Sequence, residues 1–135
     1  MSKRVLIVED EALVALTLED VLSEAGYMVC GIADRPAEAL ALASQHRPEI
    51  AVIDVRLAAG GDGIALAEQM AALLPVLILF ATGNPAEVCA RARAGQGCLS
   101  KPFQSEWLLA ALDAIQSGTD PGMPSYFPLP LTAAG

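Results

Sequence analysis

Short apolar runs alternate along this chain with longer segments of helical periodicity. Five short runs, bounded by glycine or polar residues, predict strands at residues 5–8, 28–33, 50–55, 76–81 and 97–100. Between them, apolar residues recur at spacings of three and four, which predicts helices at residues 11–25, 36–45, 62–73, 85–95 and 105–117. Strands and helices that alternate in this way form βαβ units with parallel strands. The chain is therefore predicted to be an α/β protein.

Local signals mark several element boundaries. Gly26 is expected to end the first helix, because glycine readily adopts the left-handed conformation that follows many helices. Asp34 and Asp62 are candidate N-caps of the second and third helices. With right-handed crossovers, the element order favours a five-stranded parallel sheet in the order 2-1-3-4-5, flanked by five helices, which is the flavodoxin-like fold. Its binding site lies between the first and third strands.

The composition changes after residue 117. Residues 118–135 hold four of the nine prolines and show no helical periodicity, so they are predicted to form a flexible, proline-rich C-terminal tail. Tyr126, Phe127 and Leu129 are spaced among these prolines and would suit docking of the tail on a neighbouring molecule. The expected organisation is one domain of residues 1–117 followed by a tail of residues 118–135.

Composition excludes several classes of function. A formal charge of −8 argues against nucleic acid as a partner, since such proteins carry a basic patch. Three cysteines without CxxC spacing suggest neither a disulfide framework nor a zinc site. The first residues are too poor in apolar side chains for a signal peptide, and no apolar run has membrane-spanning length. A cytoplasmic location with no membrane partner is therefore expected.

Chemically active side chains follow four of the predicted strands. Glu9 and Asp10 follow the first, Asp54 the third, Thr82 the fourth and Lys101 the fifth. The carboxyl ends of parallel strands meet at one edge of a sheet, where ligands bind. Three neighbouring carboxylates repel one another, and a hard cation with oxygen ligands, such as Mg²⁺, resolves the repulsion. Asp54 is then a candidate nucleophile for a phosphoryl group, which Lys101 and Thr82 would contact.

These residues carry a resemblance to a known family. In order along the chain they resemble the motifs of CheY-like receiver domains of bacterial two-component response regulators: Val8-Glu9-Asp10-Glu11, Asp54, Asp62-Gly63, Ala81-Thr82-Gly83 and Lys101-Pro102-Phe103. The resemblance covers residues 4–117. It implies a stand-alone response regulator that takes a phosphoryl group on Asp54 from a sensor histidine kinase or a histidine phosphotransfer protein. It would signal by phosphorylation-dependent contact with a downstream protein, or forward the group in a phosphorelay.

The resemblance also assigns ligands and roles. It implies that Mg²⁺ is bound by Asp10 and Asp54, by Glu9 through water, and by the backbone carbonyl of Arg56. It places a cis peptide bond before Pro102. Such a chain is not an enzyme in the usual sense, because it catalyses only its own phosphorylation and dephosphorylation. The guanidinium of Arg56 is further expected to cover the phosphoryl oxygens, where a bidentate contact is favoured.

The sequence departs from the common pattern at Cys98, where many receivers carry the Tyr or Phe whose rotation transmits the signal. The stretch Phe80-Ala81-Thr82-Gly83 partly resembles a Phe-Ala-Thr-Gly subfamily without that aromatic. Signal transmission through Thr82 and residues 84–95 is therefore expected instead.

Other functions remain open from the sequence. One alternative is a pseudo-receiver that acts by binding only. Another is a small phosphatase of the haloacid-dehalogenase type, although that chemistry requires an aspartate where this chain has Arg56. A flavodoxin-like cofactor binder is opposed by the acids after the first strand, which would repel a phosphate. The cognate kinase, the downstream target and the oligomeric state, whether monomer or homodimer, are not set by these patterns.

Overall fold

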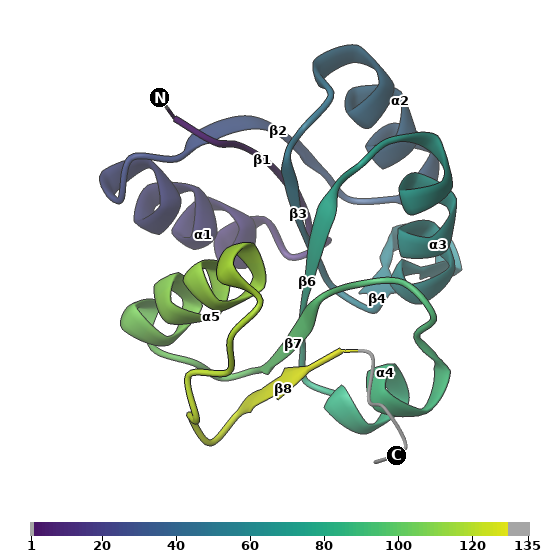
Figure 1. Cartoon of the computed structure of the whole chain (residues 1–135). Coiled ribbons are helices and arrows are strands. Elements are labelled where there is room, and N and C mark those ends of the chain that lie inside the picture. The colour runs from purple at the N-terminus through teal and green to yellow at the C-terminus, as the bar shows by residue number, and fades with distance from the viewer. Residues whose placement is uncertain (1, 130–135) are drawn as a thin grey trace.

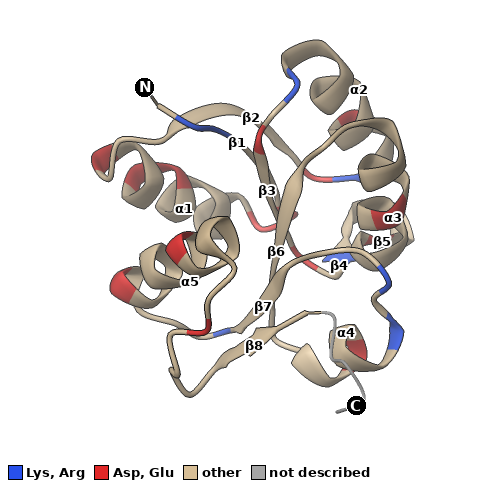
Figure 2. Ribbon diagram, viewed as in Figure 1, with Lys and Arg blue, Asp and Glu red and all other residues tan. Residues whose placement is uncertain are grey.

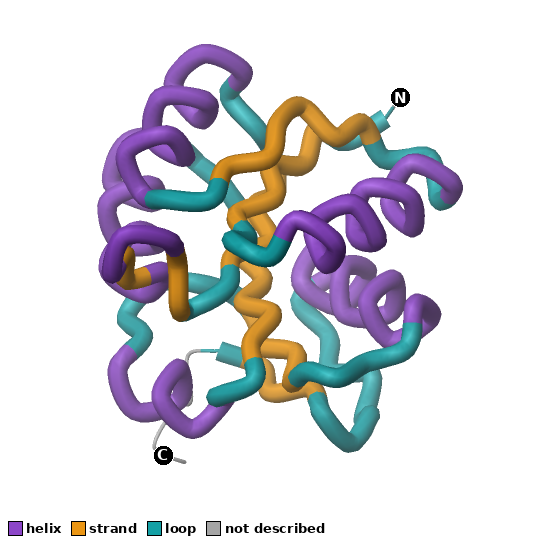
Figure 3. Tube along the Cα trace, turned by 180° about the vertical axis from the view of Figure 1, so that it is seen from behind, coloured by secondary structure: helices purple, strands orange, loops and turns teal. Residues whose placement is uncertain are grey.

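The computed structural model describes residues 2–129. A twisted sheet forms its centre and lies between two layers of helices (Figure 1), which Figure 3 shows from the opposite side. One face is covered by helices α1 (Ala12–Glu24) and α5 (Ser105–Ser117). The other face is covered by α2 (Pro36–His46), α3 (Gly63–Leu73) and α4 (Pro85–Arg91).

Within residues 2–129, the main sheet has six strands in the order β2-β1-β3-β6-β7-β8. They are β1 (Arg4–Val8), β2 (Met28–Ala33), β3 (Ile50–Ile53), β6 (Leu77–Thr82), β7 (Gly97–Ser100) and β8 (Tyr126–Pro128). The first five of this order pair in parallel, which confirms the predicted flavodoxin-like arrangement. A short antiparallel hairpin, β4 (Arg56–Leu57) with β5 (Gly61–Asp62), follows β3.

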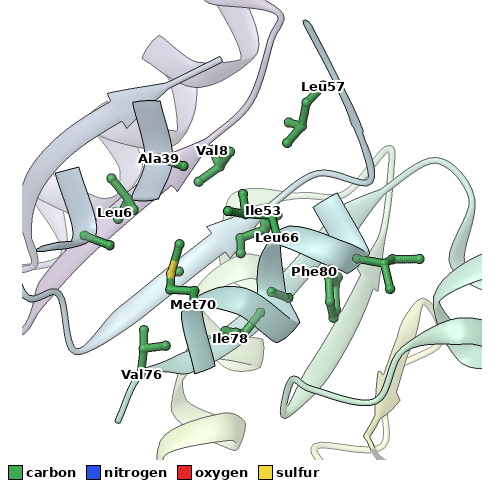
Figure 4. Close-up of a cluster of buried hydrophobic side chains, with 14 of the residues drawn as sticks. Leu6, Val8, Ala39, Ile53, Leu57, Leu66, Met70, Val76, Ile78 and Phe80 are labelled. Atoms are coloured by element: carbon green, nitrogen blue, oxygen red, sulfur yellow. The ribbon is translucent and has the colours of Figure 1, made fainter. Parts of the chain in front are cut away.

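The central strands are buried on both faces and divide the core into two clusters. Along β1, Leu6 and Val8 point towards α2 and α3, while Val5 and Ile7 point towards α1 and α5. Figure 4 shows the first cluster, in which Met70 of α3 packs near the strand residues. Continuous apolar runs rather than alternating ones are the usual signature of a parallel sheet covered on both faces.

The predicted helix ends are confirmed at two of three positions. Gly26 has a φ of 95° directly after the C-cap of α1. Asp62 caps α3, since its side chain accepts hydrogen bonds from the amides of Ile64 at 2.9 Å and Ala65 at 3.4 Å. The N-cap of α2 is instead Arg35, because the Asp34 carboxylate is bound by the guanidinium of Arg35 and does not accept from the helix.

Two predicted elements are shorter in the structure. The third strand ends at Ile53 rather than at residue 55, because the chain turns into the β4–β5 hairpin. Helix α4 ends at Arg91 rather than at residue 95. Gly95 has a φ of 116°, which a helix does not use, and a Cβ there would lie 2.7 Å from the ring of Phe80. The chain therefore leaves the helix early to enter β7.

The predicted tail contributes to the sheet. Residues 126–128 form β8, which pairs antiparallel with β7, so the expectation of a purely parallel, five-stranded sheet is corrected. Tyr126 is buried against β7 and α5, a role that its proline-rich surroundings did not indicate. The last tail residues, 130–135, lie outside the described residues.

The helices are short. The longest within residues 2–129, α1 and α5, have 13 residues each, whereas a bilayer span needs about 20 apolar residues. In this part of the chain, no helix combines the length and the apolar character that a membrane crossing requires.

The capping role of Asp62 leads to a prediction about stability. Burial tends to raise the pKa of Asp62, but hydrogen bonds from Arg91, Ile64 and Ala65 outweigh this and hold that pKa below its usual value. Asp62→Ala should lower the free energy of unfolding by about 1 kcal/mol at neutral pH. This contribution is fully present above the unfolded-state pKa of about 3.9. It is lost as the pH falls through the lower folded-state pKa, so the deficit should shrink progressively in acid.

Urea denaturation at several pH values would measure the effect. The control is Glu68→Ala on the exposed side of the same helix, which should change stability by no more than about 0.5 kcal/mol. An equal loss in both variants at neutral pH would show that the cap contributes nothing specific.

Candidate functional site

Three carboxylates meet at the carboxyl edge of the sheet. Val8 of β1 is aligned with Ile53 of β3, so the residues that follow each strand lie next to each other. Carboxylate oxygens of Glu9, Asp10 and Asp54 all lie within 4.8 Å of one another. The cluster predicted from the strand ends is therefore present.

Lys101 reaches this cluster from β7, which is separated from β3 by β6. Its Nζ donates a hydrogen bond to Oδ2 of Asp54 at 3.0 Å and another to Oε1 of Glu9. Its backbone amide donates to the carbonyl of Thr82 at 2.8 Å, which anchors the residue to the end of β6. The bond between Lys101 and Pro102 is cis, as expected.

Burial and ion pairing have opposite effects on the pKa values of Glu9 and Lys101. The side chain of Glu9 is 2% exposed, and burial raises its pKa in spite of the hydrogen bonds from Lys101 and from the amide of Glu11. Burial would lower the pKa of Lys101, but its bonds to Glu9 and Asp54 outweigh burial and raise that pKa. Lys101 is therefore cationic at neutral pH, and its charge keeps a buried carboxylate tolerable.

Asp54 is held at both oxygens. Oδ1 accepts from the amide of Val55 at 2.7 Å, and Oδ2 accepts from Lys101. The side chain remains 12% exposed, so it is fixed in position but still open to a reagent from solvent. A carboxylate that is both oriented and accessible is what nucleophilic chemistry requires.

Thr82 ends β6, between the strands that carry Asp54 and Lys101. It is 2% exposed, and its Oγ1 accepts from the amide of Asn84 at 3.0 Å. A hydroxyl that accepts one hydrogen bond still has a proton to donate. Thr82 is thus placed at the predicted edge with a donor available for a ligand.

The side chain of Arg56 lies towards α4 in this structure. The guanidinium is 72% exposed and donates to Oε1 of Glu87 at 2.8 Å. Glu87 also accepts from Asn84 and Arg91, so three side chains meet at one carboxylate. That the guanidinium covers a phosphoryl group on Asp54 stays a prediction, as does the role of its backbone carbonyl as a metal ligand.

Glu87 was not among the site residues predicted from the sequence. Together with Arg91, which also pairs with Asp62, it links α4 to the β4–β5 hairpin beside the site. Glu87 precedes Arg91 by four residues, a spacing that places both on one helix face and could have indicated their pairing. The contacts to Arg56 and Asp62 join distant parts of the chain, so no local pattern indicated them.

The acidic cluster fits a hard divalent cation. Its donors are carboxylate oxygens, the ligand type that Mg²⁺ prefers, and three carboxyl groups share the single ammonium group of Lys101. Both oxygens of Glu9 already accept hydrogen bonds, from Lys101 and from the amide of Glu11. Asp10 and Asp54 are therefore the better candidates for direct ligands, which agrees with the expectation that Glu9 acts through water.

Comparisons with known proteins give a consistent picture. The chain matches the response regulator receiver domain family over residues 5–113. It is 36% identical over 119 residues to the transcriptional regulatory protein PdtaR of Mycobacterium tuberculosis, covering 85% of this chain and 57% of PdtaR. It is 31% identical over 118 residues to the chemotaxis protein CheY of Thermotoga maritima, covering 85% of this chain and 98% of CheY.

A solved structure has the same architecture. The receiver domain of the PhyR response regulator of Erythrobacter litoralis superposes with a TM-score of 0.78 at 25% sequence identity, covering 91% of this chain and 96% of that one. The chain spans little more than half of PdtaR, so the activity of that whole protein does not transfer to it directly. The match over most of the chain, together with the acids and the lysine at the sheet edge, shows that this protein belongs to the response regulator receiver domain family.

Proposed function

We propose that this chain is a phosphorylation switch that accepts a phosphoryl group on Asp54 from a phosphohistidine and signals by protein contact. The observation that carries the proposal is the arrangement around Asp54. Its carboxylate is fixed by Val55 and Lys101, and two further acids lie within reach of the same cation site. These features serve phosphoryl transfer better than simple binding.

The proposed step is an in-line displacement. An oxygen of Asp54 attacks the phosphorus, the bond from phosphorus to the donor's histidine nitrogen breaks, and that nitrogen leaves with the electron pair and takes up a proton. The product is an acyl phosphate on Asp54. The ammonium of Lys101, now 3.0 Å from Asp54, would neutralise a phosphoryl oxygen, and the hydroxyl of Thr82 would donate to another. Such preorganised charge is the main contribution that proteins make to phosphoryl transfer.

Asp10 and Asp54 would hold Mg²⁺, with Glu9 nearby and the Arg56 carbonyl as a further oxygen. When bound, the ion supplies positive charge to the phosphoryl oxygens. The protein's own contribution is to hold Lys101 through Glu9, so that the ammonium stays beside Asp54 while the acids are engaged with the cation.

A groove beside the site suits the phosphodonor protein. A cavity of about 550 Å³ lies between α1 and the segment after β7, and Leu13, Val14, Lys101 and Phe103 are among its lining residues. Leu13 is 79% exposed, so a partner that covered it would gain the free energy of burying an apolar side chain. We propose that a sensor histidine kinase or a histidine phosphotransfer protein packs an apolar helix face here and so presents its phosphohistidine to Asp54.

A change at the phosphorylation site would be transmitted to the surface through α4. Arg56 and Asn84, each two residues beyond a site residue, both bind Glu87 of that helix. Phosphoryl oxygens would compete with Glu87 for Arg56 and so change how α4 is held. Whether the chain then contacts a downstream protein or passes the phosphoryl group on is open in this proposal.

The first prediction concerns the acceptor. Incubation with acetyl phosphate and Mg²⁺ should add the mass of one phosphoryl group, and Asp54→Asn or EDTA should abolish the addition. Asp34→Asn is the matched control, because Asp34 follows another strand of the sheet, β2, but lies outside the acidic cluster. Mass spectrometry of the intact chain reads the result, and undiminished labelling of Asp54→Asn would disprove the assignment.

A second prediction concerns the cation. Asp10→Asn should weaken Mg²⁺ binding at least about ten-fold, equivalent to ~1.4 kcal/mol, because it removes a charged ligand from the cluster. Glu11→Gln changes the charge equally one residue away, outside the cluster, and should leave the affinity within about two-fold. Calorimetric titration with Mg²⁺ measures both variants. Equal weakening by the two changes would point to a general charge effect instead of coordination.

The groove provides a third prediction. Leu13→Ser should slow phosphotransfer from a phosphorylated histidine kinase about ten-fold or more, since burying one leucine contributes about 1.5–3 kcal/mol. Phosphorylation by acetyl phosphate, which needs no docking surface, should be unchanged. Leu73→Ser is the control, because Leu73 is 59% exposed but lies at the end of α3. A similar loss in both variants, or none in Leu13→Ser, would place donor docking elsewhere.

A further inference from the structure

Residues 123–129, here called the strap, close the edge of β7 (Figure 1). Two hydrogen bonds bracket the paired residues of the strap and the strand. The amide of Leu129 donates to the carbonyl of Gln96 at 3.0 Å, and the amide of Ser100 donates to the carbonyl of Ser125 at 2.8 Å. The strap therefore holds β7 along its whole length, including the end that leads into Lys101.

Tyr126 seats the strap on the sheet. Its side chain belongs to the apolar cluster that contains Leu99 and Leu112, and the residue is 6% exposed. A Cβ at Gly97 would lie 2.5 Å from the hydroxyl of Tyr126 and 2.8 Å from its ring. The φ of Gly97 lies outside the left-handed region, so glycine is needed here for space and not for backbone conformation. Gly97 and Tyr126 are thus complementary in shape.

The attachment of the strap is light. Among residues 123–129, Tyr126 alone is buried, and Phe127 is 37% exposed. A cavity of about 190 Å³ lies between the strap and the end of α5, so packing against this helix is incomplete, although it buries the ring of Tyr126. Ser125 has a φ of 70°, an unfavourable conformation for a residue with a side chain. Segments with few buried contacts open at low free energy, so the strap is suited to dock and undock while the rest of the fold stays intact.

A short chain of contacts joins the strap to the acidic cluster. Ser125 binds the amide of Ser100, the residue directly before Lys101, while Thr82 binds the amide of Lys101 itself. Lys101 is therefore held from the strap on one side and from β6 on the other. From this anchored position its Nζ reaches Asp54. When the strap undocks, one of these two backbone restraints is lost.

We propose that Tyr126 is a positioning residue: docking of the strap, seated by Tyr126 against Gly97, holds Lys101 within reach of Asp54. Because coupling between two equilibria is reciprocal, occupancy of the Asp54 site then strengthens docking of the strap by the same factor. The strap thereby becomes an element whose state depends on phosphorylation. Its effect on phosphorylation rests on the function proposed above, whereas its hold on the Lys101 backbone does not.

Amide hydrogen exchange tests that hold directly in the full chain. Tyr126→Ala should speed exchange at Ser100, Lys101 and Leu129 about ten-fold, and Tyr126→Phe should stay within about two-fold of the unaltered chain because the ring is kept. Gly97→Ala should resemble Tyr126→Ala, because its methyl group displaces the ring. Added to Tyr126→Ala, the same change should have no further effect. Faster exchange confined to Leu129 and Ser100, with Lys101 unaltered, would overturn the positioning role.

Phosphorylation by acetyl phosphate with Mg²⁺ supplies the second measurement. Tyr126→Ala and Gly97→Ala should each lower the rate constant of phosphorylation about five-fold, with Asp54 still fully labelled at long times. Tyr126→Phe, which keeps the ring, should have the rate constant of the unaltered chain. Val29→Ala on β2, at the opposite edge of the sheet, is the control for general loss of stability and should keep the original rate. Unchanged rates in Tyr126→Ala, at temperatures where it is folded, would show that the strap only covers the sheet edge.

The reciprocal effect completes the test. Beryllofluoride with Mg²⁺ should slow exchange at Leu129 in the unaltered chain, by the same factor by which docking of the strap tightens beryllofluoride binding. Exchange at Leu129 that does not respond would contradict the coupling. If the unaltered chain accepts no phosphoryl group, the proposed function fails. The exchange at Lys101 in Tyr126→Ala then still decides whether the strap positions that residue.

Discussion

The pairing of Lys101 with Glu9 and Asp54 is the interaction on which the site depends. Glu9 is nearly inaccessible to solvent, and a buried carboxylate without a partner would cost several kcal/mol or take up a proton. Lys101 supplies the partner and bonds Asp54 with the same ammonium group. Because one cation serves two acids, any group that binds Asp54 must share Lys101 with Glu9. A change at Asp54 therefore also alters the hydrogen bond between Lys101 and the buried Glu9.

The sheet topology brings these residues together on rigid strand ends, so little conformational freedom is lost when they pair. The acids arrive on the ends of β1 and β3, which are direct neighbours, and Lys101 arrives on β7, with Thr82 on β6 between them. Each strand is buried on both faces, so its end cannot move without disturbing the core. A site built on rigid strand ends is preorganised, and its contacts to α4 and to the edge of β7 lie at the periphery.

Two peripheral links leave the site in different directions. On one side, Arg56 and Asn84 bind Glu87, which connects the loops after β3 and β6 to α4. On the other side, Ser100 binds Ser125 of the strap. The first link consists of an ion pair and a hydrogen bond near the surface, which are individually weak, and the second rests on one buried ring. Both links can therefore be changed by modest energies while the core keeps the acids and Lys101 in place. Figure 2 shows that many of the other acidic residues lie along the helices, so the acids at the sheet edge form a distinct group.

Much of the fold and the site could be predicted from the sequence because the relevant signals are local. Continuous apolar runs identify strands buried on both faces, helical periodicity identifies the covering layers, and the polar residue after each run marks the ligand edge. Asp62 as a cap and Gly26 as a helix end were readable for the same reason, since each acts on backbone within a few residues. Asp34 shows the limit of such signals, because its neighbour Arg35 competes for the carboxylate that would have capped α2.

The sequence by itself therefore determined the five parallel strands, the five helices and the candidate residues at the strand ends, but not the β4–β5 hairpin, β8 or the contacts of Glu87. Only the tertiary structure decided which of these residues contact one another and which other residues they bind. Arg56 bonds Glu87 of α4, because the fold brings the segment after β3 beside that helix. The proline-rich stretch became a strand, because Gly97 leaves space that the ring of Tyr126 fills. Both outcomes depend on contacts between residues about 30 positions apart, whose free energy exists only once the core has brought them together.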